Sequence, residues 1–392
     1  PLLWSQGKDF RRTLDSRENA YQENEGVQKL EAALQLAEGL RAISPEKAMG
    51  YAQEGNLMAM SSKNAVLQAR AYDIMGKLHL MQGHLMAARD CYTKGLNIAR
   101  TTGDDMLYAI IANSAGILMQ TLGDHEQALI YYNETLEIYD RAQILPRKTM
   151  TMSNIGYLLE RLGRYDQSIN ILEEALEIVN SAPKPSLRAI SVLSANLGVS
   201  HESKGDYDLA LNYYLQSLEI KRKLKDPAPA IGMLANVFGV YSAMNKVEEA
   251  EKYYQQAWQM AIEGQNTYWQ QDLLARYAEH LERIGKKQEA IKLYEQSLEL
   301  AKHLQDQEDI IYLLNKITEF KAEAGEYETA YRLRLSLEQY QDSLHQIKMD
   351  ERINDLEQRF ELERQLETSN QELSSLQSES ENRQVKLYLS LI

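Results

Sequence analysis

Side chains that could carry catalysis or bind metal are scattered along this chain of 392 residues rather than grouped. Its seven histidines never stand four residues apart, the spacing that would place two metal ligands on one face of a helix. Cys91 is the only cysteine, and beside Tyr92 we interpret it as a buried core residue rather than a nucleophile. The sequence also lacks a phosphate-binding glycine loop, a Gly-x-Ser-x-Gly elbow and a His-Glu-x-x-His pair. We therefore predict no catalytic residue, no metal and no cofactor, and expect that the chain is not an enzyme.

A different chemistry is indicated by polar residues that recur at long, regular distances. Asn154, Asn196 and Asn236 are 42 and 40 residues apart, and Arg276 and Lys316 continue the series at intervals of 40. We call these five residues the polar ladder. A carboxamide offers a donor and an acceptor together, so it can pair with the peptide unit of any sequence. The regular spacing indicates that repeated structural units place the five side chains at equivalent positions.

The elements that would position the ladder follow the same period. Small residues recur with spacings of 40, 40, 40, 42, 40, 40 and 40, at Ala48, Ala88, Ala128, Ser168, Ala210, Ala250, Ala290 and Ala330. Five positions earlier stand residues that accept the left-handed conformation at the end of a helix: Gly83, Gly123, Gly163, Gly205, Asn245, Gly285 and Gly325. In the first unit, Ser44 and Pro45 instead predict an N-cap and a first helical position. Each unit therefore reads as helix, tight turn, helix.

Two further recurrences predict how the helices of one unit pack. Glycines upstream of the turn mark a close approach of two helices: Gly76, Gly116, Gly156 and Gly198. Four residues after the small residue comes an aromatic on the same helical face: Tyr92, Tyr132, Tyr214, Tyr254 and Tyr294. Prolines are expected between units, where a helix must stop: Pro146, Pro183, Pro185, Pro227 and Pro229.

The stretches 154–168 and 196–214 resemble tetratricopeptide repeats, through Asn-Ile-Gly-Tyr followed by Leu-Gly-Arg-Tyr-Asp-Gln-Ser and Asn-Leu-Gly-Val followed by Lys-Gly-Asp-Tyr-Asp-Leu-Ala. HEAT and armadillo repeats share the period near 40 but not this internal pattern. The resemblance implies an all-α, right-handed superhelical solenoid of about eight helix pairs with a long C-terminal helix. Repeats are expected to start near residues 29, 69, 109, 149, 191, 231, 271 and 311, in a form similar to the longer repeats of Pins-type adaptors, kinesin light chains and bacterial peptide receptors.

The resemblance also implies a peptide-binding groove lined by the first helix of each repeat. Residue by residue, it assigns to the groove Asn113, Asn154, Tyr157, Arg161, Asn196, Asn236, Arg276, Arg283, Asn315 and Lys316. An alternative stays open, in which the asparagines bond the neighbouring repeat and set the superhelical pitch. Asp73 and Lys77 stand where a chaperone-binding clamp would need Lys and Asn, which disfavours a chaperone co-receptor.

The two ends of the chain differ from the repeats between them. We divide the chain into an N-terminal arm or capping helix at 1–28, eight repeats at 29–344 and a C-terminal helix at 345–392. Interrupted apolar spacing predicts that this helix forms a short coiled coil and a homodimer, with a solvated single helix as the alternative. The apolar end at 385–392 is too short to cross a bilayer but suggests a membrane tether beyond Ile392, with ordinary packing on the coil as the alternative.

A second resemblance concerns the role of the whole chain. Ser44-Pro-Glu-Lys-Ala, Tyr340-Gln-Asp-Ser-Leu and Ile353-Asn-Asp-Leu-Glu-Gln-Arg-Phe-Glu look similar to the sensor regions of bacterial membrane signalling proteins of histidine kinase or diguanylate cyclase type. This implies a noncatalytic, ligand-sensing module on the extracytoplasmic side of the membrane. A cytoplasmic scaffold that dimerises through its C-terminal helix, and a regulatory fragment of an enzyme, stay open. The formal charge of −14 and the absence of a basic stripe exclude nucleic acid as the expected partner.

Overall fold

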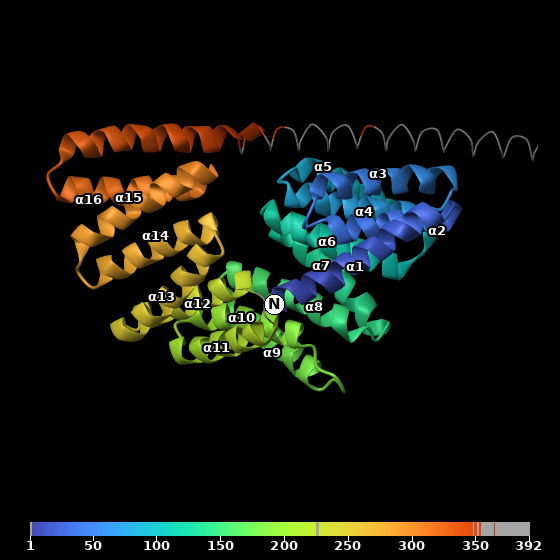
Figure 1. Ribbon diagram of the computed structural model, residues 1–392, viewed down its shortest axis with the longest axis horizontal. Helices are drawn as coiled ribbons and strands as arrows, with labels where there is room; N and C mark the ends of the chain where they lie inside the picture. Colours follow the sequence, from blue (N-terminus) through green and yellow to red (C-terminus); the bar gives the residue numbers. More distant parts are fainter. Residues whose placement is uncertain (1, 225–226, 348, 351–352, 354–363, 365–392) are drawn as a thin grey trace, which may run out of the picture.

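The computed structural model describes residues 2–224, 227–347, 349–350, 353 and 364, and within these ranges it is helical with short connections (Figure 1). The labelled helices are α1 (Leu2–Glu23), α2 (Gly26–Leu40), α3 (Pro45–Ser61), α4 (Ala65–Met81), α5 (Leu85–Thr102), α6 (Asp105–Thr121), α7 (His125–Arg141), α8 (Leu145–Arg161), α9 (Tyr165–Asn180), α10 (Leu187–Lys204), α11 (Tyr207–Leu224), α12 (Pro227–Ala243), α13 (Val247–Glu263), α14 (Thr267–Arg283), α15 (Lys287–Leu304) and α16 (Gln307–Glu323). Residues 327–347 form one more helix, which pairs with α16. The all-α solenoid is confirmed.

Consecutive helices pack as pairs, and the pairs follow one another along a curved path from α2 and α3 through α10 and α11 to α16 (Figure 1). The first helix of each pair begins three or four residues before the start that the repeat pattern predicts. The pattern is anchored on core positions, whereas the helix begins at a cap. Several caps are side chains that accept a hydrogen bond from a backbone N–H of the first turn: Asn64, Asp104, Ser186, Asn266 and Asp306.

The turns within pairs are formed as predicted. Gly83, Gly123, Gly163, Gly205, Gly285, Gly325 and Asn245 all have a positive φ, between 58° and 93°. In the first pair, Ser44 is the N-cap residue of α3 and Pro45 its first residue, although the Ser44 side chain makes no capping hydrogen bond. Left-handed residues also occur between pairs, where the sequence pattern does not predict them: Lys63, Gly103, Gln143, Gln265 and Gln305.

The predicted close approaches are confirmed by the space around the glycines. A Cβ atom on Gly76, Gly116 or Gly198 would lie 2.5 Å from a tyrosine ring of the second helix, that of Tyr92, Tyr132 or Tyr214 respectively. At Gly156 the same space is taken by the side chain of Leu172. The glycine therefore provides the notch into which the partner helix inserts a large side chain, which explains why the two positions recur together.

The prolines require a correction. Pro183 and Pro185 lie in the connection 181–186, as expected, but Pro146, Pro227 and Pro229 lie in the first turns of α8 and α12. The backbone N–H groups of a first turn have no partner within the helix, so proline costs no hydrogen bond there.

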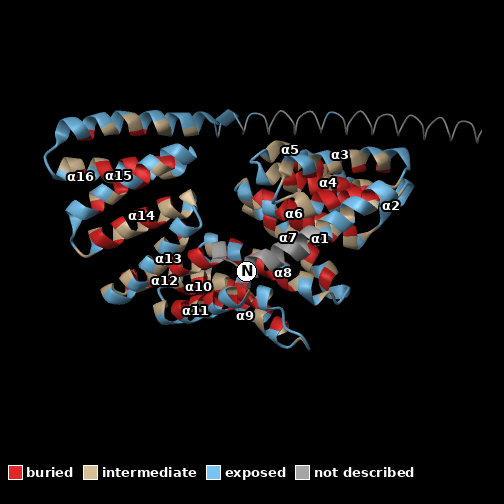
Figure 2. Cartoon of the chain, viewed as in Figure 1, coloured by how far each residue is buried: buried red, intermediate tan, exposed pale blue. Residues whose placement is uncertain are grey.

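The core runs through the whole solenoid rather than forming one centre (Figure 2). A single cluster contains Tyr92, Ile111, Tyr132 and Ile155, from the four consecutive helices α5 to α8. At the N-terminal end, α1 packs on α2, and Tyr21 of α1 stacks edge-on against Tyr51 of α3. Each pair is thus stabilised by its neighbours, as expected for a stacked array.

Candidate functional site

All ten residues assigned to the groove lie on first helices of the pairs. Asn113 is on α6, Asn154 with Tyr157 and Arg161 on α8, Asn196 on α10, and Asn236 on α12. Arg276 and Arg283 are on α14, and Asn315 and Lys316 on α16. Contacts join α6 to α8, α8 to α10, and α12 to α14, so the first helices form a layer of their own. The polar ladder therefore runs from one first helix to the next.

Two ladder asparagines bridge to the preceding first helix. The Asn154 side chain donates from Nδ2 to Oδ1 of buried Asn113 at 3.1 Å, and Asn196 donates from Nδ2 to the Ser153 hydroxyl at 3.0 Å. Thr151 also donates to Asn113 Oδ1, at 3.2 Å. These contacts are of the kind expected if the asparagines bond the neighbouring repeat and set the superhelical pitch. Each amide still keeps a second N–H and its carbonyl oxygen, for which the described residues provide no partner.

Asn236 differs from the other two. Its counterpart to Asn113 and Ser153 on the preceding helix is Ala195, which has no polar side-chain atom. Within the described part of the chain, the half-buried Asn236 side chain makes no hydrogen bond. One turn further along α12, a Cβ atom on Gly239 would meet only a carboxylate oxygen of Glu202, 3.8 Å away. The whole Asn236 amide is therefore left for an external group.

The far end of the ladder is charged. Arg276 is ion-paired with Asp272 at 2.7 Å, and Lys316 with Glu282 at 3.1 Å. Burial alone would lower the pKa of Arg276, but the nearby carboxylates of Asp272, Glu279 and Glu202 outweigh burial and raise it. Both cations of this end are thus held in place by acids, and the raised pKa of Arg276 keeps it charged at physiological pH.

The remaining assigned residues are spread along the same layer. Arg283 donates to the Ser242 hydroxyl at 2.5 Å and so links α14 to α12. Tyr157 and Arg161 are exposed at the C-terminal end of α8, and Asn315 is exposed on α16. The structure does not bring these four side chains into one cluster.

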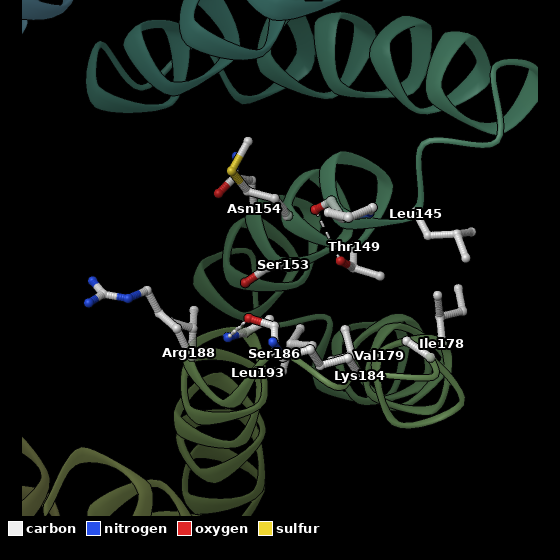
Figure 3. A pocket seen from close by; sticks show the side chains of 15 residues that line it. Leu145, Thr149, Ser153, Asn154, Ile178, Val179, Lys184, Ser186, Arg188 and Leu193 are labelled. Atoms are coloured by element: carbon white, nitrogen blue, oxygen red, sulfur yellow. Dashed lines mark hydrogen bonds between the residues drawn. The ribbon is translucent and has the colours of Figure 1, made fainter. Parts of the chain in front are cut away.

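A pocket that the sequence pattern does not predict lies between α8, the end of α9 and the start of α10 (Figure 3). It has a volume of about 410 Å³. Its walls are mainly apolar, and Ser153 and Asn154 join it to the ladder. The signal that could have revealed it is the single spacing of 42 residues, which coincides with Pro183 and Pro185 in the six-residue connection 181–186.

Models of the tetratricopeptide repeat family match residues 67–141, 148–223 and 273–308. Together with the helix pairs and their notches, these matches decide the family. The chain is a tetratricopeptide repeat protein. No curated protein matches it.

Solved structures of other tetratricopeptide proteins share the fold at low identity. The apo quorum sensor NprR from B. thuringiensis has a TM-score of 0.65 and 15% identity over 85% of this chain and 99% of its own. The Rap conjugation gene regulator of plasmid pLS20, in complex with the Phr* peptide, has a TM-score of 0.57 and 15% identity, over 86% of this chain and 96% of its own. Aspartyl phosphate phosphatase F from Bacillus subtilis has a TM-score of 0.59 and 14% identity, over 85% of this chain and 90% of its own. At these identities the likeness establishes the fold alone.

Potentially reactive groups of this tetratricopeptide protein lie in its core. Cys91 is buried, and burial raises the pKa of its thiol to about 11, so it is a thiol rather than a thiolate near neutral pH. The Ser242 hydroxyl and His280 Nδ1 are 2.7 Å apart, but both residues are buried. Among the described residues, no three His, Cys, Asp or Glu side chains gather as a metal site would require.

In the described part of the chain, no helix combines the length and the apolar character needed to span a membrane. The apolar end at 385–392 and most of the predicted coiled coil lie outside the described residues, so the tether and the coil stay predictions.

Proposed function

We propose that this chain is a noncatalytic module that binds an extended polypeptide along its first helices. The observation that carries the proposal is the row of ladder amides that ends in Asn236, whose donor and acceptor are both open. An amide in that state can accept from one peptide N–H and donate to one peptide C=O of a bound strand, whatever its side chains. Asn154 and Asn196 are already oriented by their bridges, and each keeps an N–H and a carbonyl oxygen that could pair with the same strand.

The charges of the layer give a bound polypeptide a direction. Exposed apolar side chains, including Met150, Tyr157 and Val192, lie on α8 and α10, whereas paired charges dominate α14 and α16. A ligand with an apolar part and a charged part would fit only one way round. Such a polypeptide signal would suit the ligand-sensing part of a bacterial signal-transduction protein. Peptide binding by the Rap regulator of similar fold supports this proposal.

The second candidate function is a scaffold that dimerises. It is favoured by Tyr327, Tyr331 and Leu335, which stand four residues apart on the last described helix and are largely exposed. An exposed apolar stripe of this kind is a surface that another protein surface could cover.

The leading proposal is tested with dodecapeptides selected from a random display library on the full chain. We expect Asn236→Ala to weaken binding of the selected peptides about tenfold, the worth of one or two hydrogen bonds, with no change in melting temperature. Fluorescence anisotropy and circular dichroism measure the two quantities. Asn154→Ala is the matched control: it breaks a bridge between repeats and should lower the melting temperature. Selected peptides that bind Asn236→Ala as tightly as the unmodified chain would contradict the proposal.

A further inference from the structure

The pocket between the fourth and fifth repeats exists because this connection is longer than the others. Six residues, 181–186, join α9 to α10, whereas two or three residues join α3 to α4, α5 to α6 and α13 to α14. Three residues of this connection, Ala182, Lys184 and Ser186, line the pocket. Helix α8 forms its opposite wall (Figure 3). The pocket is therefore a local departure from the repeat, not a feature that every repeat has.

The interior of the pocket is suited to an apolar side chain. Leu145, Met150 and Val192 line it and are 43%, 46% and 43% exposed, so much apolar surface faces solvent here. Ile178, Val179 and Leu193 also line the pocket. A volume of about 410 Å³ lies within the usual range of ligand pockets, which starts near 300 Å³. Covering this surface would remove it from water, which is favourable in proportion to its area.

The charge at the pocket is opposite to that of the protein. No Asp or Glu is among the lining residues, although the chain carries 57 acidic residues and a formal charge of −14. Lys184 and Arg188 are the only charged lining residues. Both are exposed, and Arg188 extends away from α10 (Figure 3). Neither is ion-paired with any described residue. A carboxylate at the rim would meet two available cations.

We propose that this pocket binds an apolar side chain of the polypeptide ligand whose neighbour in sequence is Asp or Glu, with the carboxylate paired to Arg188 or Lys184. The inference rests on the proposed function, because Asn154 belongs to both the ladder and the pocket wall. A strand bound along the ladder passes the pocket mouth at that residue. The pocket thereby selects an acidic–apolar pair at one point of an otherwise sequence-tolerant ligand.

The test uses reversible disulfide capture at the pocket. Cys91 is the only native cysteine and is buried with a raised pKa, so Val192→Cys supplies the one accessible thiol of the full chain. The probes are four dipeptides, Asp-Leu, Asn-Leu, Lys-Leu and Asp-Ser, each carrying the same C-terminal cystamine disulfide and mixed in equal amounts under partial reduction. Intact-protein mass spectrometry gives the share of each adduct. We expect Asp-Leu to exceed Lys-Leu and Asp-Ser at least fivefold.

Two changes in the Val192→Cys background check the stated causes. Arg188→Glu should reverse the order of Asp-Leu and Lys-Leu, because it replaces an attracting charge with a repelling one. Ala182→Phe, in the connection rather than in a helix, fills the pocket and should remove the preference for Leu over Ser. Gln259→Cys, on the exposed side of α13, is the control thiol and should capture all four probes equally. Equal capture at Val192→Cys, or the same ranking at Gln259→Cys, would overturn the inference.

The capture and peptide-binding experiments together distinguish an error in the pocket inference from an error in the proposed function. Equal capture at Val192→Cys together with weakened peptide binding by Asn236→Ala would refute the pocket and leave polypeptide binding standing. A clear ranking at Val192→Cys together with no effect of Asn236→Ala would instead refute the ladder as the binding element.

Discussion

At the scale of single residues, a recurring hydrogen bond joins the two helices of a repeat. The hydroxyl groups of Tyr132, Tyr214 and Tyr294 each donate to a side chain twelve residues upstream, at 3.2, 2.6 and 3.0 Å. The acceptors are Gln120, Glu202 and Glu282. Tyr92 has Leu80 at that position, and its buried hydroxyl has no hydrogen-bond partner among the residues that the structure describes. Burial of an unsatisfied hydroxyl opposes folding.

Replacing these tyrosines should therefore have opposite effects. Tyr92→Phe removes an unpaired buried hydroxyl and should leave stability unchanged or raise it by up to about 1 kcal/mol. Tyr214→Phe leaves the Glu202 carboxylate without its donor and should destabilise by about 1–3 kcal/mol. Thermal and denaturant unfolding of the two variants measures the difference. A larger loss in Tyr92→Phe than in Tyr214→Phe would show that Tyr92 has a partner after all.

His280 makes the sixth and seventh repeats sensitive to acid. Burial is the main cause that lowers its pKa, helped by Arg283 and Lys286 and opposed by Glu251. Because the pKa is lower in the folded than in the unfolded state, its contribution is complete above about pH 6.5 and is lost as the pH falls further, when only the unfolded chain takes up the proton. We expect His280→Gln to reduce the fall in melting temperature between pH 7 and pH 5. His303→Gln, at an exposed position, should leave that fall unchanged; equal slopes for all three proteins would exclude His280 as the cause.

At the scale of the elements, the sequence predicted the turns whose left-handed conformation favours glycine or asparagine. The left-handed turns at Gly83 and Asn245 were predicted because few other residue types accept that conformation. Gln143, Gln265 and Gln305 adopt it without such a signal, since the packing of consecutive pairs imposes it on whichever residue stands there. The same limit applies to the helix starts, which depend on caps outside the repeating core positions.

One of these turns can be improved. Gln265 is exposed, has a φ of 48° and makes no hydrogen bond with its side chain among the described residues. Gln265→Gly should stabilise by about 0.5–1 kcal/mol, because relief of the left-handed strain exceeds the entropy that glycine adds to the unfolded chain. The reverse change, Gly285→Ala at a φ of 82° in open space, should destabilise by about 1 kcal/mol. The midpoints of denaturant unfolding measure the stability of both variants. A destabilising Gln265→Gly would mean that the glutamine side chain contributes to the turn.

At the scale of the whole molecule, periodicity located the candidate site but not its contacts. The position of each ladder residue follows from the 40-residue period, which reports what repeats. Whether Asn196 meets Ser153, or Asn236 meets Ala195, depends on contacts between helices about 42 residues apart. The pocket at 181–186 was missed for the related reason that it arises where the period fails. In a repeat protein, departures from the repeat are therefore the most informative about function, and the structure is needed to identify them.

The exposed stripe on the last described helix bears on whether the protein is a monomer or a dimer. If the stripe of Tyr327, Tyr331 and Leu335 forms a dimer interface, Tyr331→Glu should shift the full chain towards monomer, because a charge there would be buried in the interface. Truncation after Leu344 keeps the stripe but removes the predicted coil, so it separates the two routes to a dimer. Sedimentation equilibrium over a range of concentrations measures the association. A dimer lost on truncation but kept in Tyr331→Glu would assign dimerisation to the C-terminal helix, whereas a monomer at all concentrations would rule out both surfaces and leave polypeptide binding as the function of the isolated chain.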